Sequence, residues 1–480
     1  MNTDINFYDF KIYGNYLIAQ HRSFIRDVEI NPLLNRFLFG DIKVDLSLPG
    51  PELNDRMLEQ YRTNPLETKE RRTYSAIDSA LRRVQWLEIG LEAFATKSLP
   101  LGPLEIDLTK IVRINSYEGF RLGAGIYTSP RFSHWLRLGG YAGYGFKDQR
   151  WKYGGEMRFN FSLNKDFFLG LFYAKDIYET GYPTEDQNRS LMTTSERIRK
   201  LLSSQYDRIE TYRAELGYRI FPRIHATAFV SKSSIAPTYD YSLNVNGELL
   251  SIFNNSETGI SMRYSGGENF MQLAGKKILL GRVWPMISFS YARAVDLFGA
   301  SEFNYSRYDL VGRFQVRHRP KGKTRVAVHA GLVEGVAPYG LLYNGRGAKE
   351  VVGVYVDEFF QTMRLYEFTA SRYASIFLNH NFGNVFYDNR YSKPELLIYQ
   401  NAGVGELENK DAHVSSQLLF NSFNRGFFES GVGFNNIIRW KYSNIAYYGL
   451  GCTVFYRYGE YQLAETQKNF VYRVTFNIAF

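Results

Sequence analysis

The last eleven residues, FVYRVTFNIAF from Phe470 to Phe480, decide the fold of this chain. Alternate residues of the stretch are apolar, whereas Arg473, Thr475 and Asn477 are polar. Because side chains of a strand point alternately to its two faces, one face would be aromatic and apolar and the other polar. Such a strand is typical of a barrel wall between lipid and a wet lumen. We therefore predict a C-terminal barrel assembly signal formed by Tyr472, Val474, Phe476, Ile478 and Phe480.

The composition favours a barrel over the alternative, which is an edge strand of a soluble sheet. The chain has 37 Tyr and 37 Phe, yet its mean hydropathy is only -0.31. Many aromatic residues without overall hydrophobicity indicate alternating strands with aromatic girdles. A spanning helix needs about 18 or more apolar residues in a row, and the most apolar stretches, such as Lys277 to Tyr291, contain charge or proline. The sequence thus predicts membrane-crossing strands rather than helices.

The charge of the chain is basic but dispersed. The formal net charge is +10 and the pI is about 9.2. Basic residues follow the strands rather than gathering in one patch, so we expect them in the lumen and near lipid headgroups, and we expect no nucleic acid partner. The single cysteine, Cys452, excludes an intrachain disulfide. The first residues lack the charge and apolar core of a signal peptide, so we expect one in a longer precursor of this exported barrel.

Residues 1–103 differ from the remainder and predict a small periplasmic extension of helix and coil. Proline-containing turns such as Pro49-Gly50-Pro51 interrupt this part. The segment from Asn64 to about Trp86 has the apolar spacing of a helix, which either packs against the barrel mouth or is a solvated connector. Residues 104–480 are predicted to form the barrel.

From Glu118 onward, alternation predicts a strand in nearly every interval between turn signals. The clearest interior face lies in Thr211 to Ile220, where Arg213, Glu215 and Arg219 alternate with apolar residues and should face the lumen. The predicted strands start at Glu118 to Thr128, include Thr238 to Asn246 and number about sixteen. An even number suits a single-chain bacterial barrel with both ends in the periplasm. The predicted fold class is therefore all-β, a transmembrane antiparallel β-barrel of about 16 strands.

Two insertions interrupt the alternating pattern of the predicted strands. The first, Asp176 to Asp207, contains a capping-box pattern at Thr193 to Glu196 and predicts a short basic helix. The predicted strand count places this insertion on the periplasmic side, and a single miscounted strand would move it outside. The second insertion, Ala337 to about Met363, is rich in Gly and Tyr and has no clear period. A long loop of this kind is often functional, and we expect it to fold into the lumen.

Five runs of the sequence carry a resemblance to a known family. They are Arg26 to Pro32, Glu118 to Gly123, Gly140 to Asp148, Tyr366 to Phe368 and Arg372 to Ser375. These runs resemble the Bacteroidota outer-membrane proteins known as carboxypeptidase-regulatory-like domain proteins. The resemblance covers the chain from about Phe24 to Phe480 and implies an uncharacterised C-terminal barrel, with a signal peptide and a small β-sandwich upstream.

The pattern is also similar to the BamA and TamA superfamily of assembly and translocation barrels. That similarity implies sixteen strands and a long lumen loop between strands eleven and twelve, the place of the second insertion. In the superfamily this loop carries a motif of the Val-Arg-Gly-Phe type. The nearest candidates here are Arg346 in Gly345-Arg346-Gly347 and Arg364 in Met363-Arg364-Leu365-Tyr366, and neither reproduces the motif. A solvated loop arginine is the alternative for each.

The sequence contains no pattern that predicts an enzyme, a cofactor or a metal site. The seven histidines have no tight ligand spacing, and no Gly-x-Ser-x-Gly elbow occurs. Glycine-rich runs such as Gly139 to Gly145 lie within strand periods and no helix follows them, so close strand packing explains them better than a phosphate loop.

These observations favour an outer-membrane barrel that inserts or translocates envelope proteins or lipids. We expect lipid and lipopolysaccharide around it, unfolded barrels or lipoproteins as clients, and accessory envelope subunits. The terminal strand would pair with Glu118 to Thr128, and a weak seam there is predicted at Phe120, Leu122, Gly123 and Gly125. The alternative function is a passive or ligand-gated channel for small solutes, through a lumen lined by charged residues.

Overall fold

The chain divides into two compact units, residues 1–40 and 41–480. The computed structural model describes Thr96 to Ala479 except residues 182–198, 200, 246, 274–275, 297–301, 319–321, 350–352, 390 and 443–445. It also describes Arg72, Ala93 and five short strands before residue 46. In the first unit, β1 (Ile5–Phe7) pairs with β4 (Ala19–His21), and β2 (Lys11–Ile12) pairs with β3 (Asn15–Tyr16). The helix predicted from Asn64 to Trp86 lies outside the described residues, apart from Arg72, which is helical.

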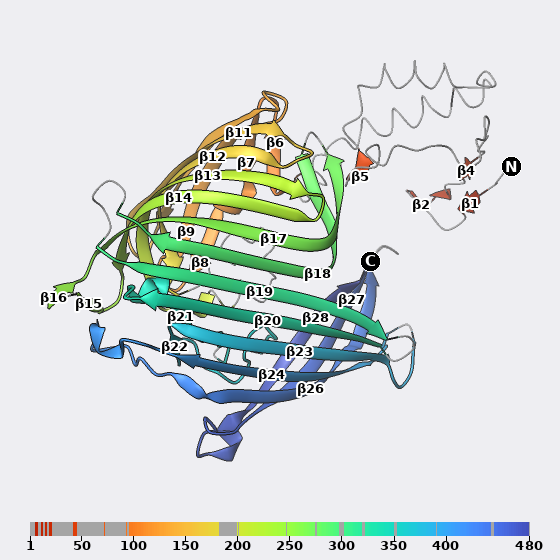
Figure 1. Ribbon diagram of the computed structural model, residues 1–480. Coiled ribbons are helices and arrows are strands. Elements are labelled where there is room, and N and C mark those ends of the chain that lie inside the picture. The colour runs from red at the N-terminus through yellow and green to blue at the C-terminus, as the bar shows by residue number, and fades with distance from the viewer. Residues whose placement is uncertain are drawn as a thin grey trace. The chain divides into compact units, whose positions relative to one another are not determined.

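The second unit is a single large sheet that closes into a barrel (Figure 1). Apart from the short strand β5, its strands pair antiparallel with their neighbours in chain order, which is the arrangement that alternating sequences with short turns favour. The fold class predicted from the sequence is confirmed. The strands are β9 (Gly119–Thr128), β10 (Leu136–Gly145), β11 (Arg150–Ser162), β12 (Phe167–Glu179), β13 (Tyr206–Phe221), β14 (Ile224–Pro237), β17 (Phe253–Leu273), β18 (Lys276–Ala294), β19 (Tyr305–His318), β20 (Gly322–Gly335), β23 (Arg372–Asn384), β24 (Glu395–Glu406), β26 (Phe423–Tyr442), β27 (Ala446–Tyr458) and β28 (Phe470–Ala479).

The wall begins before β9, with a strand that is interrupted in its middle. The short strands β7 (Leu104–Asp107) and β8 (Val112–Asn115) both pair antiparallel with β9, on the edge that does not face β10. A single 3-10 turn, η2 (Leu108–Lys110), separates them, and Asp107 caps it through its side chain. With β7 and β8 counted as one strand, the wall has about sixteen strands, as predicted. The prediction had missed this first strand because the turn breaks its alternation.

The predicted pairing of the terminal strand with Glu118 to Thr128 is wrong. In the order round the barrel, β5 (Ile42–Asp45), β6 (Ser98–Leu101), β7 and β8 stand between β28 and β9. The short strand β5 also pairs in parallel with the end of β17. When β7 and β8 are counted as one strand and the four-residue strands β5 and β6 are left out, β9 is the second wall strand, and its outer edge is already used by β7 and β8.

The segment predicted as a strand at Thr238 to Asn246 is not part of the wall. It contributes β15 (Ser242–Val245), which pairs with β16 (Glu248–Leu250) and β25 (His413–Val414) in a separate small sheet. This sheet lies at the end of the barrel where β28 begins, which we name the loop end; β28 finishes at the C-terminal end (Figure 1). One missed and one surplus strand explain why the predicted number was nevertheless correct.

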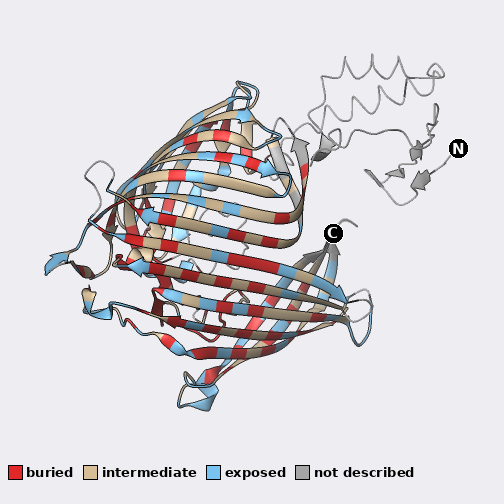
Figure 2. Ribbon diagram, viewed as in Figure 1, coloured by how far each residue is buried: buried red, intermediate tan, exposed pale blue. Residues whose placement is uncertain are grey.

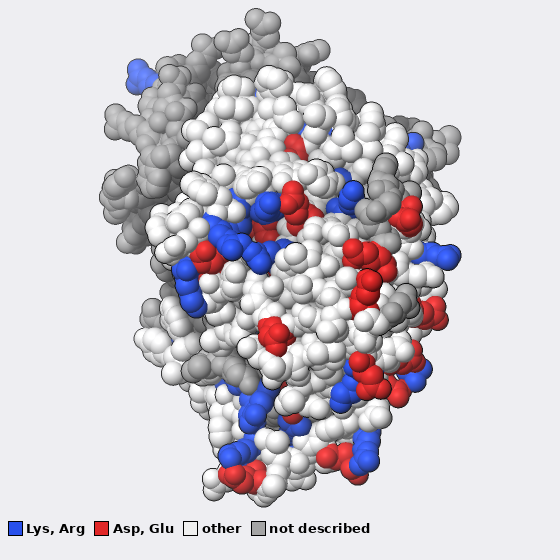
Figure 3. All heavy atoms as spheres, turned by 90° about the vertical axis from the view of Figure 1, so that its left-hand side faces the viewer, with Lys and Arg blue, Asp and Glu red and all other residues white. Residues whose placement is uncertain are grey.

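The missed first strand also changes the side on which the first insertion lies. β12 ends at Glu179 and β13 starts at Tyr206, and both residues are at the loop end because successive strands run antiparallel from β28 backward. The insertion between them is therefore at the loop end, opposite the C-terminus. If the C-terminal end faces the periplasm, as the prediction assumed, the corrected strand count moves this insertion to the outer side, which is the alternative stated with the prediction. Figure 3 views the loop end, where acidic and basic side chains are interspersed.

The outward face of the wall is apolar and carries aromatic clusters toward both ends. Burial alternates along the strands, as Figure 2 shows. On β11 to β13, Tyr173 contacts Tyr153 and Tyr212 toward the loop end, while Phe167 contacts Phe161 and Tyr218 toward the C-terminal end. The exposed side chains between these clusters are aliphatic and include Met157, Leu171 and Leu216. An aliphatic band between aromatic girdles is the pattern of a lipid-facing barrel. Among the described residues, no helix is long and apolar enough to span a membrane.

This band generates the first prediction. Leu171→Arg should destabilise the folded barrel in lipid vesicles by about 2–4 kcal/mol, because it places a guanidinium in the hydrocarbon region. Urea unfolding followed by tryptophan fluorescence measures the change. The matched control is Ser233→Arg, on the lumen side of β14, which should change stability far less. Equal losses for the two variants would contradict a lipid-facing band at Leu171.

Candidate functional site: the lumen loop and the terminal strand

The second insertion, which we name the lumen loop (residues 336–371), fills part of the barrel interior. It connects β20 with β23, the eleventh and twelfth wall strands when β7 and β8 are counted as one. It includes η3 (Tyr339–Leu341) and the paired short strands β21 (Tyr343–Asn344) and β22 (Thr369–Ala370). Its distal part is almost completely buried, with apolar side chains that pack on one another and on the wall. They are Ala348, Val356, Phe359, Phe360 and Met363.

One carboxylate holds the distal part of the loop by its backbone. Glu429 lies on the lumen face of β26 and is fully buried. Its two oxygens accept hydrogen bonds from the N–H groups of Gln361 and Thr362, both at 2.8 Å, and from the Thr362 hydroxyl at 2.7 Å. The Asn401 side-chain amide donates a fourth, at 2.7 Å. Hydrogen bonds from three loop donors to one buried carboxyl group therefore fix this part of the loop to the wall.

The terminal strand holds the loop a second time, and in two ways. Arg473 of β28 faces the lumen and donates from Nη2 to the carbonyl oxygens of Ala348, at 2.7 Å, and Gln361, at 2.8 Å. The backbone of the next residue, Val474, is bonded to the loop directly. The Tyr355 N–H donates to the Val474 carbonyl at 3.0 Å, and the Val474 N–H donates to the Gly353 carbonyl. The loop and β28 therefore form one hydrogen-bonded unit.

A third anchor is an ion-pair cluster around Glu358. Arg313 of β19 donates from Nε and Nη2 to its two carboxylate oxygens at 2.6 and 2.7 Å, and His329 Nε2 of β20 is 2.9 Å away. Arg346 donates from Nε to the Glu358 carbonyl at 2.9 Å and lies over the Phe359 ring, 4.5 Å from its centroid. Of the two predicted lumen-loop arginines, Arg346 is thus buried within the loop. Arg364 is exposed, and its backbone N–H donates to Glu367.

The first insertion contacts the base of the lumen loop. Arg199 forms a buried ion pair with Glu179 at 2.5 Å, and the Tyr366 hydroxyl donates to the same carboxylate at 3.2 Å. Ser203 is hydrogen-bonded to the Tyr366 hydroxyl as well. Arg199, Leu201 and Leu202 are helical, as the prediction of a short helix required, and residues 182–198 and 200 lie outside the described residues. The two insertions thus share one polar junction at the loop end.

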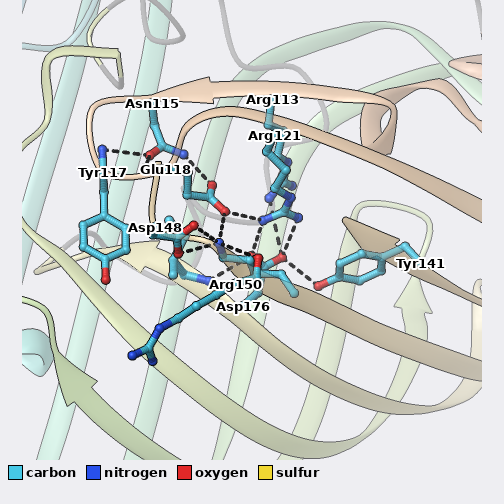
Figure 4. A network of polar contacts seen from close by, with 11 residues as sticks. Arg113, Asn115, Tyr117, Glu118, Arg121, Tyr141, Asp148, Arg150 and Asp176 are labelled. Atoms are coloured by element: carbon cyan, nitrogen blue, oxygen red, sulfur yellow. Dashed lines mark hydrogen bonds and ion pairs between the residues drawn. The ribbon is translucent and has the colours of Figure 1, made fainter. Parts of the chain in front are cut away.

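The predicted seam residues lie beside a buried charge network that fixes the first wall strands. Arg121 of β9 donates to Asp176 of β12 at 2.5 and 3.1 Å and to Glu118 at 3.3 Å (Figure 4). Lys152 pairs with Glu118 at 2.9 Å, and the Tyr141 hydroxyl donates to Asp176 at 2.7 Å. This network joins the turn between β8 and β9 to β10, β11 and β12.

Gly123 and Gly125 make room for the 3-10 turn η2. They do not weaken a pairing between β9 and β28, as the predicted seam required. A Cβ on Gly123 would lie 2.8 Å from the Lys110 carbonyl oxygen and 2.6 Å from that of Ala142, and one on Gly125 would lie 3.0 Å from the Lys110 side chain. Phe120 and Leu122 point outward and are exposed. All four residues are therefore on the second wall strand, next to η2, and not at a junction with β28.

The predicted lumen charges face the interior and are paired. Arg213 Nε lies 3.2 Å from Glu215, and its guanidinium stacks on the Phe229 ring. Arg219 pairs with Asp166 and, at 3.1 Å, with Glu268. In the terminal strand, Tyr472, Val474 and Phe476 point outward, with exposures of 74%, 47% and 53%. The side chains of Ile478 and Phe480 lie outside the described residues.

The loop end is covered by an aromatic cap. The Tyr241 hydroxyl accepts a hydrogen bond from the Tyr339 N–H at 2.9 Å and lies 2.8 Å from His413 Nδ1. Phe253 and Phe420 pack around these rings. The cap joins the lumen loop to the small sheet of β15, β16 and β25. Burial lowers the pKa of His413 to about 4, so the imidazole is neutral near pH 7 and can accept from Tyr241.

Sequence reasoning missed Glu429, Glu358 and the role of Arg473. Arg473 had a signal, because it is the one charged residue in the middle of an otherwise apolar and neutral terminal strand. Glu429 and Glu358 had none, since a single carboxylate on an alternating strand or in a loop is common. In the part of the chain that the structure describes, no group of three or more His, Cys, Asp or Glu side chains is placed to hold a metal ion.

These features define a class: a transmembrane-type antiparallel barrel of about sixteen strands, whose lumen is occupied by a loop fixed to the last strand. Comparisons with known proteins find only distant structural similarity. No protein-family model matches the chain, and no curated protein does. Solved structures with a similar arrangement include BamA from Haemophilus ducreyi lacking POTRA domains 1–3, with 10% identity and a TM-score of 0.46. CdiB from Escherichia coli has 9% identity and a TM-score of 0.43, and CdiB from Acinetobacter baumannii has 10% and 0.36.

The matches span most of this chain but a smaller share of each matched structure. They cover 77%, 79% and 75% of this chain, and 69%, 64% and 56% of the BamA and the two CdiB chains respectively. The similarity is too low to carry an argument on function, and the resemblance to the Bacteroidota family remains an expectation. The site itself must therefore support the functional proposal.

The Glu429 anchor gives the second prediction. Glu429→Ala should release the distal part of the lumen loop, because it leaves buried donors of Gln361, Thr362 and Asn401 without an acceptor, at about 1–3 kcal/mol each. Limited trypsin digestion of the folded protein in micelles should then cut at Lys349 at least about tenfold faster. Glu406→Ala removes an exposed carboxylate paired with Arg372 and is the control. A change in gel mobility on heating shows that the variant barrel is folded. If the folded variant is cleaved at Lys349 no faster than the unmodified protein, Glu429 does not anchor the loop.

The aromatic cap gives a prediction on pH. The pKa of His413 is lower in the folded cap than the ordinary value of 6.5, so the folded cap binds fewer protons than the opened one. Its stability should be complete above about pH 6.5 and decline as the pH falls toward 4. Hydrogen exchange of the β15 amides, corrected for the intrinsic effect of pH, should show this loss. His413→Asn keeps an acceptor that does not titrate, and an identical pH response in this variant would refute the assignment.

Proposed function

We propose that this protein is an outer-membrane barrel that helps to insert or translocate other envelope proteins or lipids. Its placement in the membrane is supported by the aliphatic band between two aromatic clusters on the outer face of β11 to β13. The lipid and lipopolysaccharide of the outer membrane would surround this band. The proposal includes no enzymatic step and no cofactor.

The observation that carries the proposal is the double attachment of the lumen loop to β28. A loop that only plugged a pore would need contacts with the wall in general. Here the loop bonds to the backbone and to the buried arginine of the last strand, so its position and the state of that strand are mechanically linked. A link between an internal loop and a terminal strand suits a barrel that changes its wall to admit a client chain. Unfolded barrels or lipoproteins are the expected clients, together with accessory envelope subunits.

A channel for small solutes is the alternative, and the loop argues against it. A steady pore needs a continuous aqueous path, whereas the distal part of the loop is packed in the lumen with Phe359, Phe360 and Met363 almost fully buried. The lumen charges Arg213 and Arg219, which would otherwise suggest ion passage, are in ion pairs.

The test is depletion of the full-length protein in its native cell, followed by quantitative proteomics of purified outer membranes. We expect a coordinated loss of many barrels or surface lipoproteins, at least about twofold, because their insertion would lack a catalyst. An unchanged membrane proteome with loss of uptake of one solute class would replace the proposal by the channel. Planar bilayers supply the second measurement: rare, brief conductance steps agree with assembly, and steady conductance of the unmodified protein contradicts it.

A further inference from the structure

The edge of β28 turned away from β27 is bonded to the chain's own lumen loop. On the other edge, β28 pairs with β27 in regular register, with Val474 opposite Cys452, Arg473 opposite Thr453 and Thr475 opposite Gly451. In an antiparallel strand, successive residues direct their N–H and C=O groups to opposite edges. Because both backbone groups of Val474 bond to the loop, the backbone groups of Arg473 and Thr475 are the ones directed to β27.

The loop segment on this edge, Gly353 to Tyr355, makes a single strand-like bridge to β28, and Gly353 enters it with a positive φ of 70°. It runs parallel to β28, with Val354 bridged to Val474. The Tyr355 ring is stacked on Phe455 of β27 at 6.0 Å between centroids and contacts Tyr399 of β24 at 5.2 Å. Val354 packs on Ala348, Val356 and Phe359 within the loop. We name these three residues the strap.

The strap and a separate strand cannot use the middle of this edge together. An added strand obtains its affinity from main-chain hydrogen bonds, and those bonds need the N–H and C=O of the edge residues. At Val474 both groups are taken by the strap. A strand edge that is bonded in this way is protected against pairing with other chains, which is the general problem of edge strands.

The strap is also tied to the anchors of the loop. The residues that follow it are held by Glu429, and the residues before it are held by Arg473, the side chain adjacent to the edge position itself. Withdrawal of the loop from these anchors would remove the strap from the edge as well. The wall position at Val474 thus changes from occupied to open together with the lumen.

We propose that Gly353 to Tyr355 is an internal strap that occupies the edge of β28 at Val474 and competes with an extended polypeptide for it. The identity of such a polypeptide as a client rests on the proposed function, but the strap itself does not. The partner that fits the edge is a β-strand, recognised through its backbone, and the strap is the intramolecular competitor that must leave first.

The first experiment tests whether the strap is on the edge in the folded protein. Val354→Cys and Val474→Cys are combined with Cys452→Ser, because native Cys452 lies opposite position 474 and would otherwise capture the new thiol. Bridged residues are close enough for a disulfide, so mild oxidation in micelles should cross-link most of the protein. The control pair, Val354→Cys with Tyr472→Cys, is displaced by two residues and should give at least about tenfold less. Equal cross-linking of the two pairs, or none in either, overturns the proposal.

The second experiment measures release of the edge. Tyr355→Pro removes the N–H that donates to Val474, while Tyr355→Ala removes the ring and keeps the N–H. In the proline variant, hydrogen exchange at the Val474 amide should accelerate at least about tenfold over the alanine variant, because the strap no longer closes over it. The Arg473 and Thr475 amides, which face β27, serve as internal controls and should not change. An unchanged Val474 amide in the proline variant refutes the strap.

The third experiment tests competition and uses a synthetic peptide with the sequence FVYRVTFNIAF as the strand probe. A photo-crosslinking amino acid is placed at position 472 of the barrel. It should capture the peptide at least about tenfold more in the Tyr355→Pro variant than in the variant locked by the disulfide between positions 354 and 474. Equal capture by both shows that the strap does not guard the edge and overturns the competition. A depletion experiment without effect on other barrels would refute the proposed function, yet it would leave the cross-linking and exchange results standing, so the two failures are distinguishable.

Discussion

The structure depends on the need of every backbone N–H and C=O group in a membrane to find a partner within the protein. In a barrel, each inner strand pairs its backbone groups with the two neighbouring strands. The first and the last strands are the ones whose outer edges are hardest to pair. In this chain the two strands are treated differently. The beginning is a strand broken by the 3-10 turn Leu108–Lys110, which bonds twice to β9. The end is β28, whose middle bonds to a loop that returns through the lumen.

Charged side chains in the interior also need partners within the protein, and this need determines how the interior is arranged. Alternation places Arg and Glu on the lumen face of many strands, and a charge removed from water must be paired or hydrogen-bonded. Near the first strands this yields a closed network of Arg121, Glu118, Asp176 and Lys152. Across the lumen, Glu429, Arg313 and Arg473 of the wall use the lumen loop as their partner. The loop thus supplies hydrogen-bond and ion-pair partners to charged side chains that are buried in the lumen.

The sequence predicted those features that depend on local periodicity. The outward set Tyr472, Val474 and Phe476, the inward set Arg213, Glu215 and Arg219, and the lumen position of the second insertion all follow from alternation or from its absence. The first strand was missed because three residues of 3-10 turn destroy its period. Glycines 123 and 125 were interpreted as weak pairing when they accommodate that turn, which only the packing of Lys110 reveals. Contacts such as Glu429 with Gln361 join residues 68 apart, and no local pattern contains them.

The attachment of the loop to β28 also sets an order of events during folding. The Arg473 side chain and its acceptor Ala348 are separated by 125 residues. Contacts of such large sequence separation form late, because the entropy of closing the intervening segment opposes them. We therefore expect the loop to take its final place on β28 only late in folding, when both segments are already close to each other in space.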